Sequence, residues 1–279
     1  MKQHSYESGY EALKRLSSSG HFPALTVQRA KLFLKEWPDD AAGWLILGIA
    51  LVDLARYEEA RHAIDKALEF CPKGARNIVF AHMGHVFRES GDYDHAGTWY
   101  RKAIDAKPQD ASYHIFLGAL LEKQGRLHDA EQCFRTATSC QEGCIDEGFF
   151  MLGLVLRDQE RFAEAVECLR EAIRLDPKYK MAKLALRDIE LCLEEVKRDK
   201  QQAYRSQRSF TGSDKGQKGS GGQRVIHLFD KDSAPPSPGQ KGAAAFLPFF
   251  ISERVAKWQG HSARDATSIG EGKRGHSSF

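Results

Sequence analysis

The chain has 279 residues, of which 42% are hydrophobic and 28% are charged, so its composition is that of an ordinary soluble protein with one or two domains. Its N-terminus lacks the apolar run of a signal peptide, and its longest apolar run, Ala243–Ile251, is far shorter than the about 20 residues that a membrane span requires. We therefore expect a cytoplasmic protein without membrane contact, in which the six cysteines are reduced thiols.

The first predicted element is a helical hairpin in residues 1–40. We predict it because its sequence is similar to four repeated units that follow it, which are described below. Pro38 lies 34 residues before the first proline of the repeats. Ala30 stands where later units have a bulky residue, while Lys14 and Thr26 replace a glycine and an alanine. A stack of repeats needs an end unit that closes its core. We predict that residues 1–40 are a degenerate N-terminal repeat that caps the stack.

Four similar units follow, and we place them at residues 41–76, 77–110, 111–145 and 146–179. Each has a glycine, an alanine twelve residues later, a bulky residue four further on and a second alanine three beyond that. The glycines are Gly48, Gly84, Gly118 and Gly153, and the bulky residues are Ile64, Tyr100, Phe134 and Leu169. A proline ends three of the units, and Glu142 takes its place in the third. Recurrence of several positions in register indicates one repeated structural unit.

This pattern resembles the tetratricopeptide repeat, most closely in the first unit, where Trp44-x-x-Leu47-Gly48 is followed by Ala60. The resemblance implies an all-α fold: a right-handed α-solenoid in which each unit is an antiparallel pair, helix A and helix B. A glycine within a helix costs about 1 kcal/mol relative to alanine, so it needs a packing reason. We predict that Gly48 on helix A faces Ala60 on helix B.

After the repeats, the sequence predicts a capping helix at 178–200 and a basic tail at 201–279. The helix carries apolar residues that give way to LEEVKRDKQQ, which suits a solvent-facing end. Residues 200–279 hold 13 Lys/Arg against 6 Asp/Glu and are rich in Gly, Ser and Pro. Such segments bury too little apolar surface to offset chain entropy, so we expect most of the tail to be disordered.

One island in the tail, residues 246–258, differs from its surroundings. Leu247, Ile251, Val255 and Trp258 are spaced by four, four and three residues, so they would form one apolar stripe on a short helix. Our hypothesis is that this segment docks intramolecularly on the repeats. Docking onto a separate protein and plain disorder are the alternatives.

The predicted binding surface lies on helices A, which in this family line a concave face that holds an extended peptide or a helix. In each unit we expect four side chains of helix A to be exposed on this concave face. They lie three residues before, two before, one after and four after the repeat glycine. We assign the peptide-binding groove to Leu45, Ile49, His82, His85, Ile115, Phe116, Ala119, Phe150 and Leu154. A contiguous exposed apolar surface usually marks an interaction site. The predicted function is therefore a non-catalytic scaffold that binds a peptide or helix of an unidentified protein partner.

Candidate residues for catalysis or metal binding are few. Cys140-x3-Cys144 lacks the second ligand pair of a structural zinc site, and His82 and His85 occur without an H-E-x-x-H motif. We predict no enzyme activity, no metal and no cofactor. Some relatives clamp the C-terminal carboxylate of Hsp70 or Hsp90, but in either register the corresponding positions here supply no Lys or Arg, which argues against that ligand.

The alternative function is that of a regulatory protein whose basic tail contacts nucleic acid or an acidic partner. The lysines and arginines of the tail are spaced singly, without interleaved aromatic residues, which disfavours nucleic acid as the partner.

Overall fold

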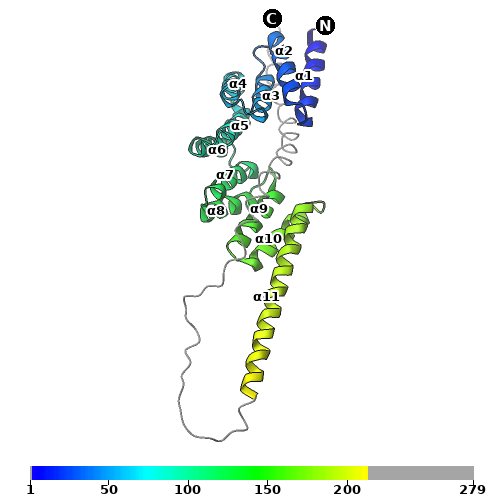
Figure 1. Cartoon of the computed structure of the whole chain (residues 1–279). Coiled ribbons are helices and arrows are strands. Elements are labelled where there is room, and N and C mark those ends of the chain that lie inside the picture. Colours follow the sequence, from blue (N-terminus) through cyan, green and yellow to red (C-terminus); the bar gives the residue numbers. More distant parts are fainter. Residues whose placement is uncertain (1, 213–279) are drawn as a thin grey trace.

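The computed structural model describes residues 2–212, and every regular element in this range is helical (Figure 1). The elements are α1 (Lys2–Ser19), α2 (Pro23–Glu36), α3 (Ala41–Asp53), α4 (Tyr57–Phe70), the short 3-10 helix η1 (Lys73–Ala75), α5 (Arg76–Glu89), α6 (Tyr93–Ala106), α7 (Ala111–Lys123), α8 (Leu127–Thr138), α9 (Ile145–Asp158), α10 (Phe162–Leu175) and α11 (Lys180–Gly212). The predicted helix at 246–258 and its docking lie outside the described residues.

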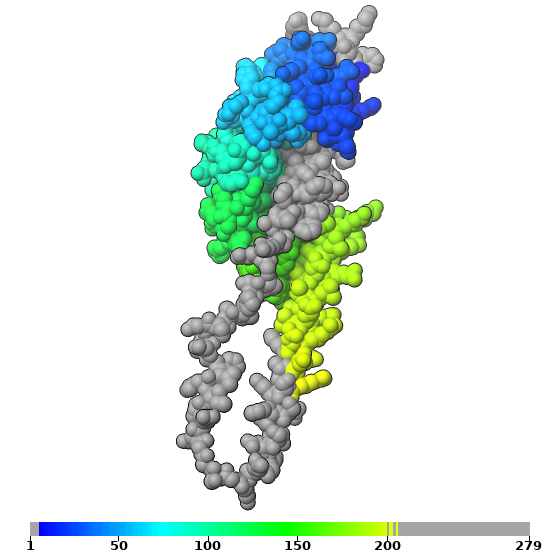
Figure 2. All heavy atoms as spheres, in the orientation of Figure 1, coloured from blue at the N-terminus to red at the C-terminus, as the bar shows by residue number. Residues whose placement is uncertain are grey.

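The helices stack as antiparallel pairs (Figure 1), and the space-filling view shows that together they form an elongated body (Figure 2). Helix A packs against helix B in the pairs α3–α4, α5–α6, α7–α8 and α9–α10, and each pair also packs against the next. The pair α1–α2 covers one end through α3, and α11 packs against α10 at the other end. This arrangement confirms the predicted all-α solenoid of antiparallel helix pairs.

The repeat glycines make room for the bulky residue of helix B in the same pair. A Cβ atom at Gly48 would lie 2.5 Å from Ile64 Cγ1, and one at Gly118 would lie 2.5 Å from Phe134 Cε1. The prediction that Gly48 chiefly faces Ala60 was therefore incomplete, because the Ala60 carbonyl oxygen is farther away, at 3.4 Å. The side chain sixteen residues after each glycine is what excludes a Cβ atom there.

The turns between helices A and B share one backbone conformation. Gly91 and Gly125 have φ of 86° and 76°, in the left-handed region that favours glycine. Ala55 and Glu160 hold the same repeat position, seven residues after the repeat glycine, with φ of 55° and 61°. Two of the four turns thus place a residue with a Cβ atom where glycine is the least strained choice.

Glu142, which replaces the proline in the third unit, joins two interhelical loops. Its backbone N–H donates to the Gln109 carbonyl at 3.1 Å, and its own carbonyl accepts from the Ala111 N–H at 2.9 Å. Its carboxylate also pairs with Lys107 at 2.7 Å. Because proline has no N–H, it could not make the first of these bonds. The departure from the repeat pattern at Glu142 therefore has a structural reason.

The N-terminal pair is held to the first repeat by an aromatic cluster. The Tyr6 ring lies 5.6 Å from Phe33 and 5.2 Å from Trp37, and the Tyr6 hydroxyl donates to Asp40 at 2.7 Å. Asp40 in turn caps α3 by accepting from the Gly43 N–H. These contacts continue the stack of helix pairs to residue 2.

The final helix is longer than predicted. A capping helix was expected to end at residue 200 and disorder to begin at 201, but α11 continues to Gly212. Its extension, residues 201–212, includes three Gln, two Arg and one Ala, all of which have high helix propensity. Figure 1 shows the end of α11 projecting beyond α9 and α10.

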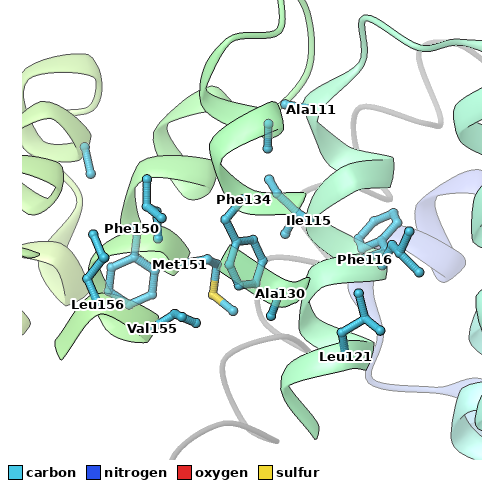
Figure 3. Close-up of a cluster of buried hydrophobic side chains, with 14 of the residues drawn as sticks. Ala111, Ile115, Phe116, Leu121, Ala130, Phe134, Phe150, Met151, Val155 and Leu156 are labelled. Atoms are coloured by element: carbon cyan, nitrogen blue, oxygen red, sulfur yellow. The ribbon is translucent and has the colours of Figure 1, made fainter. Parts of the chain in front are cut away.

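The core consists of two hydrophobic clusters. One extends from Tyr10 in α1 to Val86 in α5, and the other from Ala81 in α5 to Ile189 in α11. Figure 3 shows part of the second, to which α7, α8 and α9 all contribute side chains. Helix α5 belongs to both clusters, so it links the two halves of the stack.

Candidate interaction surface

The nine predicted groove residues lie on the four helices A, and we call this set the helix-A face. Helix α3 carries Leu45 and Ile49, α5 carries His82 and His85, α7 carries Ile115, Phe116 and Ala119, and α9 carries Phe150 and Leu154. Helix α3 contacts α5, and α7 contacts α9. The His85 and Phe116 rings, whose centroids are 4.7 Å apart, connect α5 to α7. The face is therefore continuous across four repeats.

The expectation that these nine side chains are exposed was wrong for six of them. Leu45, His82, His85, Ile115, Phe116 and Phe150 are buried. The apolar ones are members of the two core clusters, so they hold neighbouring helices together. The side chains two and three residues before each repeat glycine are consequently part of the core.

A narrower row of side chains on this face keeps partial access to solvent. Ile49, Ala119 and Leu154, each directly after a repeat glycine, are half-buried. The fourth member of the row, His85, is 7% exposed, and its ring contacts those of Phe116 and Tyr100. The accessible apolar row therefore has one residue on each of α3, α7 and α9, and on α5 its position is taken by the buried His85.

The two histidines of the face are held neutral. Burial lowers the pKa of His82 to about 4. Burial, together with Arg88 and His82, places the pKa of His85 well below its usual value. His85 Nδ1 shares a hydrogen bond of 3.0 Å with the Tyr100 hydroxyl, which fixes the imidazole ring. Neutral imidazoles in these positions contribute packing and hydrogen bonding, and they carry no charge near neutral pH.

A row of charged residues borders the apolar row. Arg88, Glu122 and Arg157 each lie four residues after a repeat glycine, on α5, α7 and α9. The Arg88 side chain is only 12% exposed, and it pairs with Glu89 at 2.8 Å. Within residues 2–212, its Nη1 atom has no hydrogen-bond partner. Periodicity placed these residues on the face, although they were not among the nine residues assigned to the groove.

Glu122 has the most perturbed carboxyl group on this border. Burial, assisted by Asp158 and opposed by Arg157, raises the pKa of Glu122 to about 7. Its Oε2 atom is buried and accepts no hydrogen bond from the described part of the chain. A buried carboxylate without a donor costs free energy, so a cation or an N–H group supplied to it would be favoured.

No arrangement for catalysis or metal binding emerges among the described residues. Residues 2–212 contain no cluster of three or more His, Cys, Asp or Glu side chains that could hold a metal ion. The six cysteines are free, and burial raises the pKa of Cys71 and Cys168 to about 11, which suppresses thiolate formation. No helix between residues 2 and 212 combines the length and apolar character needed to cross a membrane.

Comparison with protein families agrees with the helix pairs described above. Models described as "Tetratricopeptide repeat" match residues 29–75 and 146–179, and one described as "TPR repeat" matches residues 84–125. The chain is a tetratricopeptide-repeat (TPR) protein. The matched segments together include helices from all four predicted repeats and the end of the N-terminal pair.

Relatives of this TPR protein are similar over limited parts of their length. Human tetratricopeptide repeat protein 7B is 27% identical over 143 residues, which are 51% of this chain and 17% of that protein. Human DnaJ homolog subfamily C member 7 is 31% identical over 110 residues, which are 37% of this chain and 22% of that protein. The chain thus matches less than a quarter of each of these relatives.

A solved structure supports the fold. The thermophilic TPR protein TTC0263 of Thermus thermophilus is 17% identical, with 67% of this chain and 99% of that chain covered and a TM-score of 0.54. At this level of identity the similarity concerns the solenoid alone. The TPR fold is consistent with a protein–protein interaction scaffold.

Proposed function

We propose that this TPR protein is a non-catalytic scaffold that binds a peptide or helix of another protein on its helix-A face. The observation that carries the proposal is the accessible row formed by Ile49, Ala119 and Leu154, bordered by Arg88 and Glu122. From Ile49 on α3 to Leu154 on α9 the row spans four helices, and the buried His85 takes its position on α5. With packed helices about 8–10 Å apart, it would be roughly 30 Å long.

These dimensions specify the shape of the ligand. An extended peptide of about nine residues has the length of the row, since a strand rises about 3.3 Å per residue. A helix would need a narrow apolar stripe, because the row offers a single apolar side chain on each of α3, α7 and α9. Polar groups beside that stripe would reach Arg88 and Glu122, whose Nη1 and Oε2 atoms lack partners within residues 2–212. The six free cysteines fit the cytoplasmic location that we include in this proposal.

The test is selection of binders from a displayed library of short peptides, using the full chain as the target. Ile49→Glu and Leu154→Glu should each weaken binding of the selected peptides by at least about tenfold, because they place a charge in the apolar row. The matched control is His62→Glu, which adds the same charge at an exposed position on α4. Melting temperatures of all variants verify that the fold is retained. Equal loss of binding in His62→Glu, or no loss in either row variant, would contradict the proposal.

A further inference from the structure

We propose that the chain supplies its own ligand: the segment 246–258 docks as an amphipathic helix on the helix-A face, with its apolar stripe, which begins at Leu247, on the accessible row. This inference rests on the proposed function, because the docked segment would regulate access of partners to the same helix-A face. The named segment lies outside the described residues, and its sequence is what identifies it as the occupant.

The first argument is the fit of the stripe to the row. Leu247, Ile251, Val255 and Trp258 follow one side of a helix that would be about 17 Å long at 1.5 Å per residue. At the usual spacing of packed helices, that length crosses two to three helices A. The stripe is one residue wide at each turn, which matches a row that offers a single apolar side chain on each of α3, α7 and α9.

The second argument is charge complementarity. On the helix, Arg254 borders the stripe, because it lies seven residues after Leu247 and three after Ile251. The border of the row holds Glu122, whose buried Oε2 atom has no hydrogen-bond partner among residues 2–212. A guanidinium group placed there would supply the missing donor, and a charge-assisted bond to a partly buried carboxylate is a strong one. Arg254 is therefore the residue assigned to Glu122.

The third argument is reach. Thirty-four residues separate Gly212, the end of α11, from Leu247. Fully extended they span at most about 110–120 Å, and as a flexible coil about 30–35 Å. Helix α11 has 33 residues and is therefore about 50 Å long, and it starts against α10 and α9. The linker is thus long enough to return along α11 to the helix-A face.

The docked segment is bound weakly enough for an external partner to displace it. A helix this short is marginal alone, so the segment gains its helical structure only from the surface on which it folds. The linker holds the segment near the face at a raised effective concentration, which an external partner must overcome. Intramolecular docking therefore weakens the apparent affinity for any partner that uses the same row.

The test uses the full chain and a pair of matched variants. Ile251→Asp places a charge in the stripe, and Ala256→Asp places the same charge on the opposite side of the helix. Hydrogen–deuterium exchange of α5 and α7 should be about tenfold faster in Ile251→Asp than in the wild type and unchanged in Ala256→Asp. Arg254→Glu should also accelerate exchange, and combining it with Glu122→Lys should restore slow exchange. Melting temperatures identify any variant whose fold is lost.

A fluorescein-labelled peptide of residues 244–260 provides the second readout. It should bind Ile251→Asp about tenfold more tightly than the wild type, whose own segment competes for the face. Equal exchange in both aspartate variants, together with equal peptide affinity for both chains, would overturn the intramolecular contact. The proposed function has its own test, because the displayed peptides would still lose binding in Ile49→Glu if the face binds only external partners.

Discussion

Tyr100 packs directly over Gly84, and a Cβ atom at residue 84 would lie 2.5 Å from Tyr100 Cε1. The ring is fully buried, and its hydroxyl is bonded to His85 on the same helix as the glycine. The ring therefore has no room to move away. This contact is the structural reason for a glycine in the middle of α5.

Gly84→Ala should accordingly destabilise the protein by about 1–2 kcal/mol. The overlap with Tyr100 costs about 1–3 kcal/mol, and the better helix propensity of alanine returns part of that cost. Urea unfolding measures the change. Gly74→Ala is the matched control, because a Cβ atom at Gly74 would meet nothing within 4 Å. A loss of stability in Gly74→Ala as large as in Gly84→Ala would show that steric overlap is not the cause.

The left-handed turn position predicts stabilising substitutions. Ala55→Gly and Glu160→Gly should each stabilise the fold by about 0.5–1 kcal/mol, since glycine adopts a positive φ without the Cβ penalty. Gly125→Ala, at the same repeat position, should destabilise by about 1 kcal/mol. Thermal melting of the three variants verifies the signs. Destabilisation by both glycine substitutions would mean that backbone strain at this position is negligible.

Glu142→Pro restores the proline of the other repeats, yet it should destabilise the protein by about 1–2 kcal/mol. The substitution removes the N–H group that donates to the Gln109 carbonyl and leaves that carbonyl unpaired. Glu142→Gln keeps the backbone bond and loses only the ion pair with Lys107, so it should change stability by less than about 0.5 kcal/mol. Chemical unfolding of both variants separates the backbone contribution from the charge. A stabilised proline variant would refute the role assigned to the loop contact.

Glu122 predicts a specific dependence of stability on pH. Its pKa is raised to about 7 in the folded state, against about 4.3 when unfolded, so between these values the folded protein binds more protons. Stability contributed by this group is thus full below about pH 4 and is lost as the pH rises to about 7. In a chain that carries Arg254→Ala, so that the proposed pairing with Glu122 is absent, Glu122→Gln should raise stability by about 1–2 kcal/mol at pH 8 and change it little at pH 4.5.

The measurement is the difference in unfolding free energy between the Arg254→Ala chain with and without Glu122→Gln at several pH values. Taking the difference cancels the titration of other groups, including His82 and His85. A difference that stays constant from pH 4.5 to pH 8 would show that Glu122 titrates normally.

The sequence by itself determined the repeat and therefore the fold. Gly84, Tyr100 and their counterparts recur in every repeat because they pack against each other where helix A meets helix B. Each repeat has the same helix packing and therefore needs the same two kinds of residue. The same periodicity placed Ile49 and Leu154 on one face. It also placed Arg88 and Glu122 there, but only the structure indicates that their polar atoms are buried.

The tertiary structure decided which residues of that face are accessible and why the pattern fails where it does. Phe116 has the periodicity of a groove residue, but it is buried and its ring packs against those of His85 and Tyr100 in the preceding repeat. Glu142 breaks the pattern because its N–H bonds to a loop more than thirty residues away in the chain. Periodicity reports which side of a helix a residue occupies. How deeply a neighbouring helix covers that side depends on contacts between distant parts of the chain, and only the folded structure determines them.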